Sequence, residues 1–263
     1  MKNRLIIVEG LPCSGKSTAA AHIAETLKKS GYNAVFTDEG TGNHPADYEF
    51  QSYISDENMK NFSVEEQTLL KNSSARKNGG YIIELSKLEG ELFNKALQYK
   101  IYDFLPWETE KPLILDKWQE FVKNVPKDTI NVFNCCFLQN PMCETMMRFN
   151  FDEKISKEFI TEIAEIIKPL DPLCIYIRQK DFAEKILETA KEREGWLDAV
   201  VDYHINGAYG KSYGLKGFDG YIKCLEERQR REVAILESLN INKLVLDLTS
   251  YDKLYEQINN AIL

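Results

Sequence analysis

Long apolar runs and an excess of basic residues are both missing from this sequence. No stretch of the 263 residues approaches the roughly 18 consecutive apolar residues that span a bilayer. Acidic residues outnumber basic ones, 41 against 33, which gives a formal net charge of −8. A surface of that sign is poorly suited to nucleic acid or to an anionic membrane. We therefore expect neither a nucleic-acid partner nor a membrane partner.

Cysteine motifs are absent as well. The chain has six cysteines, but none forms a C-x-x-C pair and no histidine stands at metal-finger spacing from them. Although the first residues are basic, the apolar run that follows ends after Val8 at Glu9, which is too short for a secretory signal. We expect reduced thiols, no targeting segment and a cytoplasmic protein.

What the sequence does contain is a phosphate-binding loop near its start. An apolar run from Leu5 to Val8 predicts a buried strand. It leads into Gly10-Leu-Pro-Cys-Ser-Gly-Lys-Ser, a full match to the pattern G-x-x-x-x-G-K-[ST]. Apolar residues at i, i+3, i+4 and i+7 from Ala20 then predict a helix that ends near Ser30-Gly31. Strand and helix are the context that such a loop needs.

Each residue type in the loop suits a nucleotide. Backbone N–H groups of the loop bind phosphate oxygens, and the N-terminus of the following helix adds its positive dipole. Lys16 would reach the β- and γ-phosphates, and the Ser17 hydroxyl would bind Mg²⁺. We predict nucleotide contacts for Gly10, Pro12, Cys13, Ser14, Gly15, Lys16, Ser17 and Thr18.

Two adjacent carboxylates follow the second predicted strand. Residues 33–37 read as a short strand that ends at Asp38 and Glu39, and ligands of open α/β sheets bind beyond the carboxyl ends of strands. Because side chains alternate along a strand, we expect only one of the two carboxylates to face the phosphate loop directly. The longer Glu39, beside Gly40, is our choice for the catalytic base, with Asp38 as the alternative.

Residues 48–127 are predicted to form a helical insert. The segment 48–77 reads as helical, with a capping box at Ser63 and Glu66, and Asn78-Gly79-Gly80 ends that pattern. An aromatic-rich segment with a further helix follows.

Two segments compete for the third strand of the central sheet. Residues 113–116 end in Asp116, which would suit a metal site, whereas residues 129–138 are longer, rich in β-branched side chains and bounded by prolines. We assign the second segment as the strand and the first as a helix. That choice places Asn134 where an acidic residue would be convenient, and an amide binds Mg²⁺ more weakly than a carboxylate does. The second contact to the metal stays open between Asp116 and Asn134.

The C-terminal half alternates helices with strands. Its Gly-rich and Tyr-rich stretch, 206–217, has too many glycines for a regular element, and it reads as part of a mobile lid over about 194–218 or as a plain linker. The elements expected around it are a helix beyond Asp152, a strand 173–177, a helix from Asp181 (as its cap) to about Glu194, a helix 219–239 that carries Arg228, a strand 243–248 and a closing helix 251–262.

These elements predict one α/β domain over residues 1–263. Its architecture would be three-layered, α/β/α, with a mostly parallel five-stranded sheet, a helical insert and a lid.

The order of these motifs resembles the phosphate-loop kinases of the nucleoside and nucleotide kinase superfamily, thymidylate and deoxynucleoside kinases especially. The loop from Gly10 to Thr18 matches theirs residue by residue, and Asp38-Glu39 falls where those families place an acidic residue after the second strand. The acidic-Arg pair that the family carries after its third strand is absent, because Asn134-Cys135 stands there. The insert is also longer than in a simple nucleotide kinase.

The resemblance implies an ATP- and Mg²⁺-dependent kinase whose partners are a nucleoside triphosphate and a small-molecule acceptor. Glu39 or Asp38 would orient and deprotonate the acceptor, and Arg193, with Arg228 or Lys211, would close over the developing charge. The acceptor would be nucleoside- or nucleotide-like.

Other functions stay open at this point. One is a kinase for an antibiotic or a sugar-like compound, and another is a nucleotide-hydrolysing switch or regulatory module. The chain has no Asn-Lys-x-Asp motif for reading guanine. The sequence also leaves the oligomeric state open, a homodimer included.

Overall fold

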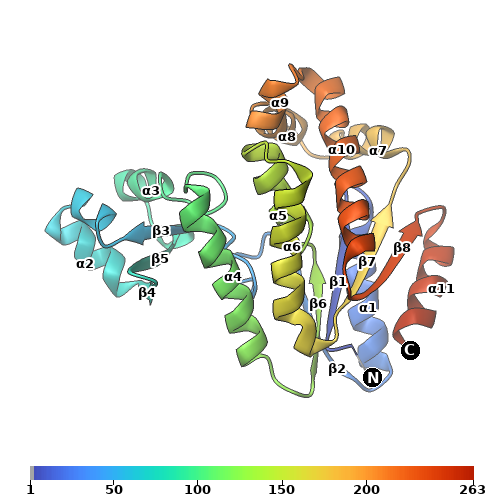
Figure 1. The fold of residues 1–263 in the computed structure, drawn as a ribbon. Helices are drawn as coiled ribbons and strands as arrows, with labels where there is room; N and C mark the ends of the chain where they lie inside the picture. Colours follow the sequence, from blue (N-terminus) through green and yellow to red (C-terminus); the bar gives the residue numbers. More distant parts are fainter. Residues whose placement is uncertain (1–2) are drawn as a thin grey trace. The chain divides into compact units, whose positions relative to one another are not determined.

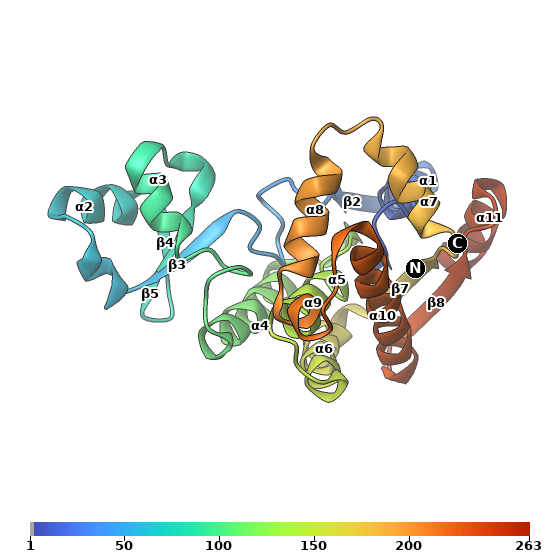
Figure 2. The same cartoon turned by 90° about the horizontal axis from the view of Figure 1, so that it is seen from above.

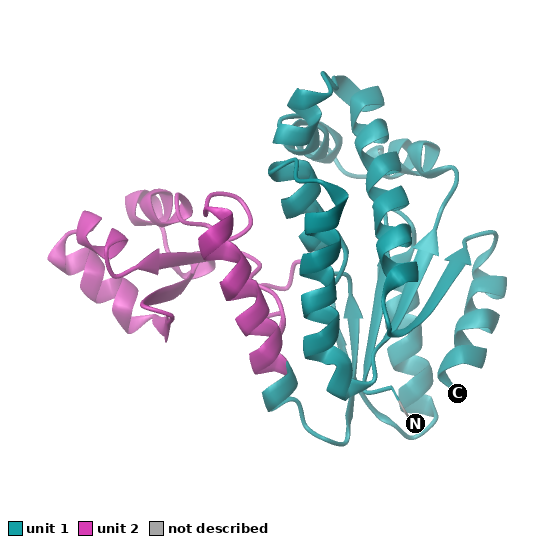
Figure 3. Ribbon diagram, viewed as in Figure 1, with its two compact units in different colours: residues 1–39, 122–263 teal, residues 40–121 magenta. Residues whose placement is uncertain are grey.

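The structure is a computed structural model that describes residues 3–263, and it divides into two compact units. The first unit comprises residues 1–39 and 122–263, and the second comprises residues 40–121 (Figure 3). The two units are described separately below.

A five-stranded parallel sheet forms the centre of the first unit (Figure 1). The strands lie in the order β2-β6-β1-β7-β8. The middle strand is buried along its whole length, as its unbroken apolar run predicts. The bounds are β1 Leu5–Gly10, β2 Asn33–Thr37, β6 Thr129–Asn134, β7 Leu173–Arg178 and β8 Asn242–Asp247.

Helices cover both faces of this sheet (Figure 1). On one face α1 and α11 pack through Ile23, Leu27 and Ile258 onto the apolar side chains of β1, β6 and β7. The other face carries α5, α6 and α10, which contact one another. This arrangement confirms the three-layer α/β/α prediction. The helices are α1 Lys16–Lys29, α5 Gln139–Met142, α6 Glu153–Ile167, α10 Gly217–Ser238 and α11 Tyr251–Ile262, with a π-helical turn, η3 Cys143–Arg148, after α5.

Three shorter helices lie at the end of the sheet toward which its strands point (Figures 1 and 2). They are α7 Phe182–Ala190, α8 Trp196–Ile205 and α9 Ala208–Ser212. The prediction that residues 206–217 form no regular element is therefore wrong. Two of the glycines there serve close packing: a Cβ atom at Gly207 would lie 2.4 Å from the Met147 carbonyl oxygen, and one at Gly210 would lie 2.3 Å from that of Ile205. The predicted cap at Asp181 is also wrong, since its side chain makes no capping hydrogen bond.

The second unit contains a three-stranded antiparallel sheet in the order β3-β5-β4. The prediction of an all-helical insert is wrong for this reason. Asn78 and Gly79, with φ of 44° and 76°, form the tight turn between β4 and β5. An Asn-Gly pair in left-handed backbone favours a hairpin rather than only ending a helix. The strands are β3 Gln51–Ser55, β4 Ser74–Lys77 and β5 Gly80–Glu84.

Helices complete the second unit. They are α2 Val64–Asn72, α3 Gly90–Leu97 and α4 Trp107–Asn124, the last of which continues into the first unit. The capping box of Ser63 and Glu66 is confirmed, because both of its hydrogen bonds form. Asp116 lies within α4, so the assignment of residues 113–116 as helix and of 129–134 as strand is confirmed, although β6 ends at Asn134 rather than at residue 138. No helix within residues 3–263 is both long enough and apolar enough to cross a membrane.

Candidate functional site

The phosphate loop joins β1 to α1 at the carboxyl edge of the parallel sheet. Gly10 begins the turn with φ of 154°, and a Cβ atom there would lie 2.6 Å from the Ile177 carbonyl oxygen and 2.6 Å from Ser14 Oγ. Helix α1 starts at Lys16 without a side-chain cap and without an acidic residue in its first turn. Its first N–H groups and its dipole are therefore available to an anion.

A buried hydroxyl in the loop also lacks an acceptor or donor partner. Ser14 is fully buried, and its Oγ has no hydrogen-bond partner among residues 3–263. Buried polar atoms are almost always bonded, so this hydroxyl fits a loop that is completed by phosphate oxygens.

Asn134, at the end of β6, links the loop to the first of the two carboxylates. Its Nδ2 donates to Ser17 Oγ at 2.9 Å and to Asp38 Oδ1 at 2.6 Å, while its buried Oδ1 has no hydrogen-bond partner among residues 3–263. The side chains of Ser17, Asp38 and Asn134 therefore place three oxygens that could bind a metal ion beside the phosphate loop. Asp116, by contrast, pairs with Lys77 within the second unit.

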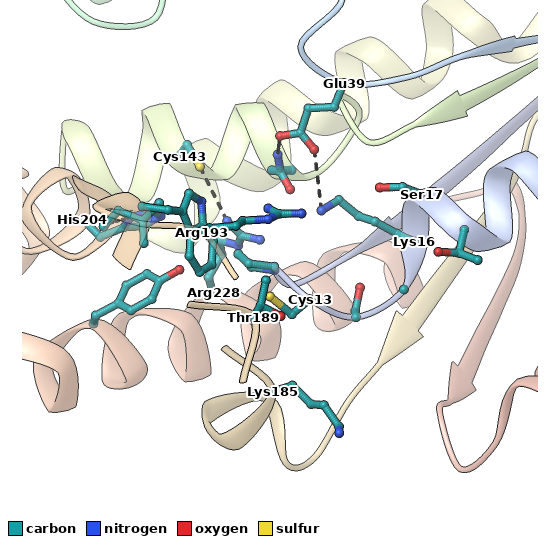
Figure 4. Close-up of a pocket in the computed structure, with 18 of the residues that line it drawn as sticks. Cys13, Lys16, Ser17, Glu39, Cys143, Lys185, Thr189, Arg193, His204 and Arg228 are labelled. Atoms are coloured by element: carbon teal, nitrogen blue, oxygen red, sulfur yellow. Dashed lines mark hydrogen bonds and ion pairs between the residues drawn. The ribbon is translucent and has the colours of Figure 1, made fainter. Parts of the chain in front are cut away.

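Glu39 lies against the lysine of the loop. Its Oε2 is 3.6 Å from Lys16 Nζ, and its Oε1 accepts a hydrogen bond of 2.8 Å from Gln139 Nε2 (Figure 4). Glu39 thus contacts the loop lysine directly, whereas Asp38 is linked to Ser17 of the loop through Asn134.

A buried carboxylate on β1 holds the segment that carries Gln139. Glu9 accepts hydrogen bonds from the backbone N–H groups of Phe137, Leu138 and Gln139 at 2.8, 2.8 and 3.3 Å. Burial raises the pKa of Glu9 to about 7 in spite of these bonds. The segment needs such support, because Cys135 and the residue after it adopt φ of 63° and 77°, which is uncommon outside glycine.

The phosphate loop, Glu39 and Gln139 line one cavity of about 690 Å³ in the first unit (Figure 4). Four cationic side chains and a single carboxylate, Glu39, line it. Cations thus outnumber carboxylates along the cavity wall, which suits a polyphosphate. The cations are Lys16, Lys185, Arg193 and Arg228. Arg193 also stacks on Trp196, with its guanidinium 5.6 Å from the ring centroid.

The end of the cavity away from Ser17 is formed by helices (Figure 4). Cys143 on η3 and His204 on α8 lie there. On α10, Tyr221 has its ring 4.9 Å from that of His204, and Arg228 Nη1 lies 3.6 Å from Cys143 Sγ. Burial lowers the pKa of His204 to about 4, and its Nδ1 lies 2.6 Å from the Val200 carbonyl oxygen. The ring is therefore neutral at pH 7, with its proton on Nδ1 and Nε2 as an acceptor.

A second hollow of about 580 Å³ lies beyond the carboxyl ends of β7 and β8. It shares Lys185 and Tyr251 with the first cavity. Gln179 at its wall is buried, and its Oε1 has no hydrogen-bond partner among residues 3–263.

Sequence patterns missed several residues that line this cavity or hold its lining. Gln139 and Glu9 matter through contacts with residues a hundred or more positions away, and Tyr221 and His204 show no motif. Of the cations predicted to close over the site, Arg193 and Arg228 line the cavity and Lys211, on α9, does not. The acidic residue Glu9, which directly follows the apolar run from Leu5 to Val8 within β1, is the one signal that sequence alone offered.

A parallel sheet whose central strand runs into a G-x-x-x-x-G-K-S loop and then a helix is the fold of the phosphate-loop NTPases. This chain therefore has that fold. Residues 4–75 match the family described as chromatin associated protein KTI12, which covers the loop and both carboxylates but less than half of the chain. The match agrees with the phosphate-loop part of the predicted resemblance, and it does not point to the thymidylate or deoxynucleoside kinases.

A solved structure, the crystal structure of APE1195, is similar over 100% of this chain and 98% of that one, at 15% identity and a TM-score of 0.36. So low a score bears on neither the fold nor the function. No curated protein matches the chain.

Proposed function

We propose that this protein is a phosphotransferase that moves the γ-phosphoryl group of ATP to a small-molecule acceptor. The observation that carries the proposal is the placement of Glu39 against Lys16 of the phosphate loop, with Asp38 linked to Ser17 through Asn134, beside a cation-lined cavity of about 690 Å³. A binding module would need the loop but not a carboxylate held beside its lysine.

The donor side follows from the loop. Its backbone N–H groups and Lys16 would bind the β- and γ-phosphates, and the hollow near Tyr251 would take the nucleoside. Gln179, whose buried oxygen lacks a partner, is suited to accept a hydrogen bond from an amino group of the base.

The residues at the loop fit Mg²⁺. The Ser17 hydroxyl, the Asp38 carboxylate and the Asn134 amide oxygen are hard oxygen donors, and Mg²⁺ in such sites takes few protein ligands because phosphates and waters supply the rest. When bound, the ion neutralises charge on the β- and γ-oxygens. In this arrangement Asp38 serves the metal side, directly or through water, and Asn134 holds Asp38 beside Ser17.

Glu39 serves the acceptor side. Donor phosphates would compete for Lys16 and so release Glu39 Oε2 from its ion pair at 3.6 Å. Glu39 would then accept the proton of an acceptor hydroxyl as the new O–P bond forms and the bond from Pγ to the β–γ bridging oxygen breaks, with ADP as the leaving group. Gln139 would keep the carboxylate oriented, and Arg193 would neutralise charge on the phosphoryl group in transfer.

A regulatory module that hydrolyses nucleotide slowly is the second candidate. The match of residues 4–75 to a family described as chromatin associated favours it, since the matched segment contains the loop but none of α7–α10.

Release of ADP from ATP and Mg²⁺ in the presence of pooled nucleosides, nucleotides, sugars and aminoglycosides tests the proposal. Stimulation by one pool supports a kinase. A slow release that no pool changes supports the regulatory module instead.

A further inference from the structure

Two buried donors at the far end of the cavity have no acceptor. Tyr221 is 0% exposed and Arg228 is 1% exposed, yet both line the cavity. Tyr221 Oη and Arg228 Nη2 each lack a hydrogen-bond partner among residues 3–263. An unsatisfied buried donor costs about 1–3 kcal/mol, and more when it is charged.

The contacts that Arg228 makes do not involve its Nη2. Its Nε lies 3.0 Å from Glu232 Oε1, and its Nη1 lies 3.6 Å from Cys143 Sγ, which is a weak acceptor. Glu232 is itself engaged on its other oxygen, which accepts a hydrogen bond of 2.6 Å from Tyr176 Oη. Burial raises the pKa of Cys143 to about 11, so the thiol adds no negative charge at pH 7.

The surroundings favour an anion at this point. No carboxylate apart from Glu39 lines the cavity, and that residue is already held by Lys16 and Gln139. His204 is neutral and therefore adds no charge here. Its Nε2 can accept a hydrogen bond from a ligand. A guanidinium and a phenol that line the same cavity, each with an unpartnered donor, suit the oxygens of a phosphate or carboxylate.

We propose that Tyr221 and Arg228 form an oxyanion subsite for the acceptor, which is therefore a small molecule that carries a phosphate or carboxylate group. This inference rests on the proposed kinase function, and it narrows the acceptor to anionic compounds. The aromatic side chains of Trp196 and Tyr203 on the cavity wall would cover the remainder of the molecule.

A binding experiment tests the subsite without turnover. The protein is saturated with Mg²⁺ and a non-hydrolysable ATP analogue, so that the phosphate loop is filled, and inorganic phosphate or acetate is then titrated by calorimetry. We expect one anion site, with the preferred anion showing which oxyanion the acceptor carries. The Tyr221→Phe variant should bind it about tenfold more weakly, because one donor is lost while the ring stays.

Two variants make this measurement decisive. Tyr209→Phe removes a hydroxyl from a buried tyrosine on α9 that does not line the cavity, and it should bind the anion as the wild type does. Arg228→Lys keeps a charge but loses the planar donor pair, and it should weaken binding as well. No anion site in the loaded wild type, or equal affinity in Tyr221→Phe, would overturn the subsite.

Turnover with matched compounds separates this inference from the proposed function. ADP release is compared for pairs that differ in one oxyanion, such as thymidine with its monophosphate and glucose with glucose 6-phosphate or gluconate. A preference for the anionic members, with a Michaelis constant that Tyr221→Phe raises about tenfold while that for ATP is unchanged, supports the subsite. Preference for the uncharged members overturns the subsite but not the kinase, whereas no stimulation by any pair counts against the kinase and leaves the subsite to the binding experiment.

Discussion

The two ends of the cavity are built in different ways. The phosphate-loop end is made by one continuous stretch, residues 10–18, which a strand and a helix hold in place. The far end draws Cys143, His204 and Tyr221 from η3, α8 and α10. One end is therefore a motif shared by phosphate-loop NTPases, and the other is an assembly of residues from separate helices. In the proposed function, the first end binds the donor nucleotide and the second end binds the acceptor.

At the phosphate-loop end of the cavity, the largest effect on turnover is expected from Lys16→Ala. It should lower turnover by about 10³-fold or more, because the cation beside the β- and γ-phosphates contributes several kcal/mol to charge stabilisation in the transition state. The melting temperature should stay close to that of the wild type. Lys29→Ala, on an exposed turn of the same helix, is the matched control in the turnover assay. Near wild-type turnover in Lys16→Ala would rule out the donor site.

The adjacent carboxylates sharpen the comparison, because in the proposed function Glu39 serves the acceptor, whereas Asp38 is linked to Ser17 through Asn134. Glu39→Gln should lower turnover by about 10²- to 10⁴-fold with little change in ATP affinity, as expected for loss of a general base. Asp38→Asn should instead raise the Mg²⁺ concentration needed for half-maximal rate. The measurement is turnover against Mg²⁺ concentration for both variants. Exchanged patterns would reverse the two assignments.

Nucleotide binding should stabilise the folded protein. A ligand that binds only the folded state at about 100 times its dissociation constant adds roughly 2.7 kcal/mol to the free energy of unfolding. We expect ATP with Mg²⁺ to raise the melting temperature in a thermal scan, and Ser17→Ala to lose the part of the shift that depends on Mg²⁺. An absent shift at millimolar ATP would speak against a working loop.

The smallest predicted effect is a pH dependence of folding stability that arises from Glu9, on the strand that leads into the phosphate loop. Its pKa in the folded protein is about 7, raised from 4.5 by burial, so the folded state binds more protons than the unfolded state between these values. Stability should therefore fall as pH rises from about 4.5 to 7, with a slope of up to about 1.4 kcal/mol per pH unit. Urea unfolding across this range measures it. Glu9→Gln should flatten the profile and Glu158→Gln, exposed on α6, should not; an unchanged slope in Glu9→Gln contradicts the assignment.

The phosphate-loop end of the cavity and most of the core could be predicted from the sequence. The loop, β1 and α1 could be predicted because their signals are local, and Thr129–Asn134 could be separated from the helix around Asp116 by length and β-branching. Strands β3 and β5 of the second unit were missed because their pairing, Tyr53 opposite Ile82 for example, is formed by segments that each carry little periodicity. Gln139 and Tyr221 could not be predicted at all, since only the tertiary fold brings Gln139 to Glu39 and places Tyr221, two turns before Arg228 on α10, at the cavity wall.

The fate of the γ-phosphoryl group tests the central claim most directly. ATP labelled at the γ-position is incubated with the protein, Mg²⁺ and the matched acceptor pairs, and the products are separated. The account predicts label in an anionic acceptor, with transfer lost in Lys16→Ala and reduced about 10²-fold or more in Glu39→Gln. Label found only in inorganic phosphate, at a rate that no acceptor changes, would contradict it.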